Sequence, residues 1–118
     1  MRAITHNEYE FLVRVENTTG KNLHEMGLSA TAMVEEMADG EMGSLLFVVS
    51  NNANTKRQLG NVFAEGEFSD LDGVPVKFAV NLDTDGRLYE LDLWRVDFGP
   101  LQRFPARHDQ LTFLADTA

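Results

Sequence analysis

Pairs of carboxylates separated by one residue are the feature of this sequence best suited to chemistry. Side chains two residues apart on a β-strand project from the same face, so each pair would hold two acidic groups close together. Such groups can split their pKa values and act as acid and base, or they can attract a cation. The pairs are Glu65 with Glu67, Asp70 with Asp72, and Glu90 with Asp92. A small hydrolase or transferase that uses sheet carboxylates is therefore one function that fits the sequence.

A second acidic pattern resembles a calcium-binding loop. Asn81, Asp83, Asp85, Gly86 and Asp92 have the spacing of positions 1, 3, 5, 6 and 12 in such a loop. The first of them is Asn, however, and the last is Asp, whose side chain is one carbon shorter than the usual Glu. Both flanking segments have the pattern of strands. We therefore expect a hairpin turn here and no metal site.

Other chemical motifs are missing from the chain. The histidines, His6, His24 and His108, are scattered along the sequence, and we expect them to be unpaired. The chain has no cysteine, which excludes disulfides, thiol catalysis and cysteine-ligated zinc. Ser44 does not lie in a G-x-S-x-G motif, and no glycine-rich nucleotide-binding motif occurs. We expect no cofactor.

The charge favours a basic protein as partner. Nineteen acidic and ten basic residues give a net charge of −9, and segment 65–97 holds nine acidic and three basic residues. Such a field repels phosphates, which disfavours nucleic acids and anionic membranes. Trp94 and Tyr89 flank an acidic pair, as aromatic residues do in many interfaces, although we favour a place in the core for Trp94. The candidate partner-binding residues are Glu65, Glu67, Asp70, Asp72, Tyr89, Glu90 and Asp92.

The elements that position these residues begin with a helix. Thr5 and Glu8 have the spacing of a capping box, in which a hydroxyl and a carboxylate satisfy free backbone amides. Phe11, Leu12 and Val15 follow at the spacing of one helical face. The pattern predicts a helix over residues 6–17, docked by these side chains on a sheet.

Strand patterns occupy most of the remaining chain. Residues 30–37 fit a helix or a strand, and we favour a strand because a turn and a β-branched apolar run follow. The further strands are predicted at 45–49, 58–68, 74–82 and 87–98, with D-x-D-G turns at 70–73 and 83–86. We therefore predict a single α+β domain over residues 1–118, with the helix packed on an antiparallel meander of about five strands.

The last strand has an irregular apolar pattern. Leu88 and Trp94 have one parity in the sequence, whereas Leu91 and Leu93 have the other. A regular strand with one buried face would not mix them. Either both faces of this strand are buried or a β-bulge shifts its side chains.

Two motifs resemble those of a family of small acidic bacterial domains of unknown function. They are DG-x-MGSL, at residues 39–45, and LYELD-[IL]-W-[KR]-VDF-x-PL, at residues 88–101. The resemblance implies the order of elements described above and no agreed activity. The chain is also similar in size and charge to immunity proteins that neutralise bacterial toxins.

We predict a non-enzymatic binding protein of the immunity or inhibitor type, whose acidic face occludes a basic partner such as a bacterial toxin. Two alternatives stay open: the small hydrolase or transferase, and a structural or oligomeric domain without chemistry. The first eight residues lack the apolar core of a signal peptide, and no stretch reaches the roughly 20 apolar residues of a membrane span. We expect a cytoplasmic protein.

Overall fold

The computed structural model describes residues 1–48, 57–105 and 109–114. His108 and the last residue of the strand predicted at 45–49 lie outside these ranges. The elements in chain order are β1 (Arg2–Ala3), α1 (His6–Thr19), the 3-10 helix η1 (His24–Met26), β2 (Met33–Glu36), β3 (Leu45–Phe47), β4 (Leu59–Ser69), β5 (Pro75–Asp83), β6 (Leu88–Arg95) and β7 (Thr112–Phe113).

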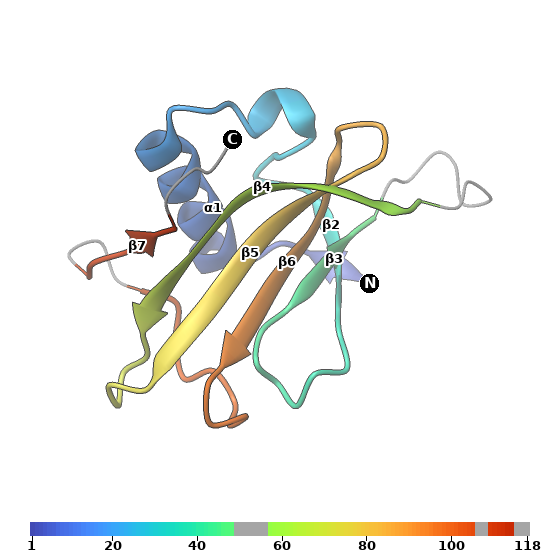
Figure 1. Cartoon of the computed structure of the whole chain (residues 1–118). Coiled ribbons are helices and arrows are strands. Elements are labelled where there is room, and N and C mark those ends of the chain that lie inside the picture. Colours follow the sequence, from blue (N-terminus) through green and yellow to red (C-terminus); the bar gives the residue numbers. More distant parts are fainter. Residues whose placement is uncertain (49–56, 106–108, 115–118) are drawn as a thin grey trace.

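All seven described strands form one antiparallel sheet in the order β1-β2-β3-β6-β5-β4-β7, and α1 lies against one of its faces (Figure 1). The predicted fold class is therefore confirmed, with β4, β5 and β6 as the meander. The sheet has seven strands, where about five were expected. The additional two are the edge strands β1 and β7, and two residues are too few to show a periodic pattern.

The helix begins and ends as its local sequence dictates. Thr5 accepts a hydrogen bond from the backbone of Glu8, and the Glu8 carboxylate accepts one from the backbone of Thr5, which confirms the capping box. Gly20 ends the helix in a left-handed conformation that glycine adopts without a steric penalty. The helix therefore extends two residues beyond the predicted boundary at 17.

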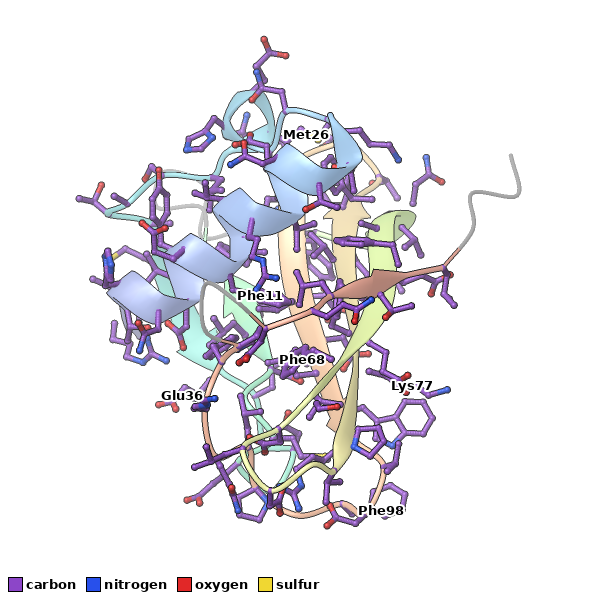
Figure 2. The ribbon with its side chains drawn as sticks, turned by 90° about the vertical axis from the view of Figure 1, so that its left-hand side faces the viewer. Phe11, Met26, Glu36, Phe68, Lys77 and Phe98 are labelled. Atoms are coloured by element: carbon purple, nitrogen blue, oxygen red, sulfur yellow. The ribbon has the colours of Figure 1, made fainter. Side chains whose placement is uncertain are left out.

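The core lies between α1 and the sheet. Leu12 and Val15 are completely buried, and Phe11 packs edge-on against Phe78 of β5 and Phe68 of β4, with ring centroids 5.2 and 5.6 Å apart. Figure 2 shows Phe11 and Phe68 in this interface. The helix therefore covers one face of the meander and leaves the opposite face open. Within the described residues, no helix is long and apolar enough to cross a membrane.

A bulge in β6 explains its irregular apolar pattern. Leu82 pairs with Leu88 and Asn81 pairs with Glu90, so Tyr89 is an additional residue on the β6 side. The bulge reverses the parity of the buried side chains after Leu88. Of the two explanations left open by the sequence, the structure therefore shows the bulge.

The strand predicted at 87–98 is too long at its carboxyl end. β6 ends at Arg95, because the Asp97 carboxylate accepts hydrogen bonds from the Arg95 side chain and the Gly99 backbone and turns the chain. Phe98 within this turn has a φ of 62° and is 71 % exposed. Trp94 is also not a core residue: it lies opposite Lys77 on the open face and is 48 % exposed.

Candidate functional site

The open face of the sheet gathers acidic side chains from β4 and β6. Glu65 lies opposite Ala79 of β5, and Ala79 lies opposite Asp92 of β6. Alternation along β6 places Leu91 and Leu93 in the core, so Asp92 between them faces outward. The two carboxylates therefore stand on either side of a small alanine side chain.

A second row of side chains across the three strands lies beside the row of Glu65, Ala79 and Asp92. Glu67 of β4 lies opposite Lys77 of β5, which lies opposite Trp94 of β6. Lys77 points away from α1, on the open side of the sheet (Figure 2). Together the rows hold three carboxylates, one ammonium group and one indole.

These rows surround a shallow depression of about 300 Å³, which we call the sheet hollow. Ala79 lies between Glu65 and Asp92, and Thr112 of the edge strand β7 also lines the depression. Its lining residues are Glu65, Gly66, Glu67, Lys77, Phe78, Ala79, Asp92, Trp94, Thr112 and Leu114. The hollow thus combines acidic groups with apolar and aromatic surface.

The carboxylates of the sheet hollow form no ion pair among the described residues, although Lys77 lies opposite Glu67. In the part of the chain that the structure describes, Glu65 and Glu67 make no ion pair or side-chain hydrogen bond, and Lys77 makes no ion pair. Asp92 has one long contact, 3.4 Å from the Ser44 hydroxyl. The exposed carboxylates are therefore available to a cationic ligand.

A family model described as a domain of unknown function, DUF6984, matches residues 1–105. The chain belongs to this family. The match covers α1 and strands β1 to β6, including two sides of the sheet hollow, whereas β7 lies beyond it. No curated protein and no solved structure matches the chain. Membership in a family of unknown function, expected from the two motifs, is thus confirmed at that level.

Glu90 differs from the other acids on the open face of this DUF6984 chain. It is half-buried, and its carboxylate accepts a hydrogen bond of 2.8 Å from the amide of Asn81. The side-chain oxygen Oδ1 of Asn81 is buried and has no partner among the described residues. Glu90 is therefore part of a partly buried polar pair beside the sheet hollow, and not one of its lining residues.

Asp70 and Asp72 lie away from the sheet hollow, at the β4–β5 turn. Both bind the guanidinium of Arg95, at 2.9 and 3.0 Å. Burial alone would raise the pKa of Asp70, but hydrogen bonds from backbone amides and from Arg95 outweigh it and lower that pKa. The structure therefore separates this pair from Glu65 and Glu67 and gives it a cation within the chain.

Tyr89 lies at the opposite end of the meander. Its ring packs on the guanidinium of Arg57, 5.0 Å from the ring centroid, and Arg57 also forms an ion pair with Asp83 at 2.9 Å. Asp83 thus has a cation within the chain, while Asp92 of the calcium-like pattern lies along β6 opposite Ala79. Among described residues, no group of three or more His, Asp or Glu side chains is placed to hold a metal ion.

His24 is not unpaired, in contrast to the prediction. Its Nδ1 lies 2.8 Å from Oε1 of Glu16, and its Nε2 lies 2.8 Å from the hydroxyl of Tyr9. His6 makes a 4.0 Å contact with Glu10. Tyr9 and Glu16 are seven residues apart and thus share one face of α1, a signal that the sequence did contain.

Proposed function

We propose that this chain is a binding protein whose open sheet face holds a basic protein partner. The observation that supports this proposal is the sheet hollow, which Glu65, Glu67 and Asp92 line together with the exposed Trp94. An indole face attracts Lys and Arg side chains, and carboxylates that lack a cation attract them over a longer range. A cationic side chain entering the hollow would meet both.

The net charge supports the same class of partner. With a net charge of −9, the chain attracts basic proteins over a distance, and this attraction accelerates association at low ionic strength. The kind of basic partner that we propose is a toxin domain, which the chain would inhibit by covering its basic surface. An acidic face of this kind imitates the charge of a nucleic acid substrate.

Binding at the sheet hollow can be measured through the fluorescence of Trp94, because it is the single tryptophan of the chain. A peptide rich in Lys and Arg is titrated into the protein while tryptophan emission is recorded. The reference peptide carries Gln in place of each basic residue. We expect a saturable emission change with the basic peptide alone, and weaker binding as NaCl is raised from about 50 to 500 mM, since salt screens exposed charges.

The test variant is Glu65→Gln with Glu67→Gln, because both side chains are exposed and Gln has nearly the same shape. Exposed ion pairs contribute about 0.5–1 kcal/mol each, so we expect affinity to fall roughly tenfold. Glu90 is avoided, since its replacement would disturb the buried amide of Asn81.

The matched control is Glu10→Gln with Glu25→Gln, two exposed acids of α1 and η1 outside the sheet hollow. It changes the net charge by the same amount. An equal loss of affinity in both double variants would mean that the peptide responds to overall charge, and would contradict a site at the sheet hollow.

A further inference from the structure

A hydrogen-bonded chain of three side chains joins α1 to η1. The hydroxyl of Tyr9 lies 2.8 Å from Nε2 of His24, and Nδ1 of His24 lies 2.8 and 2.9 Å from the two oxygens of Glu16. The order is hydroxyl, imidazole, carboxylate. This is the order of a nucleophile, its general base and the group that orients the base.

The hydrogen bonds indicate which atoms of Tyr9, His24 and Glu16 carry protons. Burial would raise the pKa of Glu16, but hydrogen bonds from the backbone and ring of His24 outweigh it and lower that pKa, so the carboxylate is ionised. An ionised carboxylate only accepts hydrogen bonds, so Nδ1 of His24 carries a proton. When the ring carries no second proton, Nε2 has a free lone pair to which the Tyr9 hydroxyl can donate.

The imidazole is held in this orientation from several sides. The backbone amide of His24 donates to Glu16 at 3.0 Å, and the rings of His24 and Tyr9 meet edge-on with centroids 5.8 Å apart. Leu23, the preceding residue, is completely buried and anchors η1 to the core. The His24 side chain nevertheless remains 41 % exposed, so a small molecule can reach the group.

We propose that Tyr9 is a nucleophilic modification site, which accepts acyl groups from activated acyl compounds with a good leaving group, such as thioesters and aryl esters. A neutral acyl carbonyl suits this site better than a phosphate would, because the chain carries a net charge of −9. The proposal does not depend on the binding of a basic protein to the sheet hollow.

The reaction is a single acyl transfer. The phenolic oxygen of Tyr9 attacks the carbonyl carbon and forms an ester bond, while the bond to the leaving group breaks and that group departs with its electron pair. Nε2 of His24 takes the phenolic proton, and the Glu16 carboxylate stabilises the imidazolium that forms. The proton then passes to the leaving group or to solvent, which restores neutral His24.

The chain contains its own reference for the test, because its second tyrosine is also half-buried but has a different neighbour. Tyr89 packs on the Arg57 guanidinium, and no described imidazole or carboxylate contacts its hydroxyl. If a nearby cation alone determined reactivity, Tyr89 would react faster than Tyr9. If a general base determines it, Tyr9 reacts faster.

The experiment treats the full chain with p-nitrophenyl acetate and measures acetylation at each tyrosine by peptide mass spectrometry. Hydroxylamine treatment separates tyrosine esters, which it cleaves, from lysine amides, which it leaves intact. General-base assistance typically contributes about 100-fold or more. We expect Tyr9 to be acetylated at least about tenfold faster than Tyr89. Equal rates, or a faster Tyr89, would overturn the proposal without any variant.

The matched variant is His24→Gln, since glutamine can accept the Tyr9 hydrogen bond but cannot take its proton. With circular dichroism unchanged, Tyr9 acetylation should fall to the rate of Tyr89. A rate that stays at the wild-type value would overturn the proposal. So would a burst of p-nitrophenolate that persists in Tyr9→Phe and is lost in His24→Gln, since His24 would then be the nucleophile.

Discussion

At the scale of single residues, the amino end of α1 shows how two side chains define a boundary. The Thr5 hydroxyl and the Glu8 carboxylate each accept a hydrogen bond from the other residue's backbone. Arg2 of β1 binds the same carboxylate through both of its terminal nitrogens, at 2.9 and 2.8 Å. The cap therefore also attaches the first strand to the helix.

Thr5→Ala should lower the free energy of unfolding by about 1 kcal/mol, because one amide of the first turn loses its acceptor. Urea denaturation followed by circular dichroism measures the change. Thr18→Ala on the same helix is the control. Its side chain is exposed, and alanine favours helix, so stability should stay equal or rise by a few tenths of a kcal/mol. Equal losses in both variants would contradict a specific role for the cap.

Gly66 in β4 has no room for a side chain. A Cβ atom there would lie 2.3 Å from the carbonyl oxygen of Thr112 and 2.8 Å from the ring of Phe78. Phe78 and Phe113, whose ring centroids are 5.6 Å apart, lie opposite Gly66 on the two neighbouring strands. The missing side chain thus lets β7 approach β4 closely.

Gly66→Ala should displace β7 and lower the thermal midpoint, because the alanine methyl group would overlap the backbone of that strand. Hydrogen exchange at Leu114, whose amide donates to the Glu65 carbonyl at 2.9 Å, gives a local measurement. Faster exchange there is expected. Unchanged exchange and an unchanged midpoint would show that the two strands are less closely packed than the structure indicates.

At the scale of elements, the two D-x-D-G turns are stabilised in the same way. The first aspartate of each turn binds an arginine from elsewhere in the chain: Asp70 binds Arg95, and Asp83 binds Arg57. Arg57 also donates to the carbonyl oxygens of Phe47 and Leu88, both at 2.6 Å. It therefore joins β3 to the β5–β6 hairpin at one end of the sheet.

Arg57→Lys should destabilise the protein by about 2 kcal/mol, since three acceptors that are bound by three separate guanidinium nitrogens cannot all be reached from the one nitrogen of an ammonium group. Differential scanning calorimetry or urea denaturation measures this loss. Arg103→Lys is the control, because the Arg103–Asp109 pair is about half exposed and such pairs contribute little. If the two variants were equally stable, the Arg57 contacts would not hold these strands together.

At the scale of the whole molecule, two classes of carboxylate differ in their partners. One class is hydrogen-bonded inside the chain and has a pKa lowered from its ordinary value; its members are Glu8, Glu16, Asp70, Asp83 and Asp97. The other class lines the sheet hollow and has no cation bound within the described chain. The first class stabilises the fold, and the second provides the charge for the proposed binding.

Because of the first class, the free energy of unfolding should depend on pH. A folded-state pKa below the unfolded value near 4 means that the unfolded chain binds more protons at acidic pH. The free energy of unfolding should therefore be fully maintained above about pH 5 and fall as pH drops below about 4. Urea midpoints at pH 7, 5, 4 and 3 measure this. Asp83→Asn should show a smaller difference between pH 7 and pH 3, and an identical difference would contradict the assignment.

The sequence by itself predicted the elements whose signals are local. The capping box spans four residues, the apolar pattern at 74–82 alternates over nine, and the D-x-D-G turns are four residues each, so neighbouring residues suffice to specify them. The helix, the meander and the fold class follow from these signals. The two-residue strands β1 and β7 do not, because their pairing depends on partners elsewhere in the chain.

Only the tertiary structure decided which acidic pairs face solvent without a cation. Glu65 with Glu67 and Asp70 with Asp72 look alike in the sequence, but Arg95, more than 20 residues further on, neutralises the second pair alone. The exposure of Trp94 was likewise decided by the tertiary structure, because it depends on the bulge in β6 and on which face of the sheet α1 covers. Register and helix docking act between distant residues, and for that reason local patterns could not determine the composition of the sheet hollow.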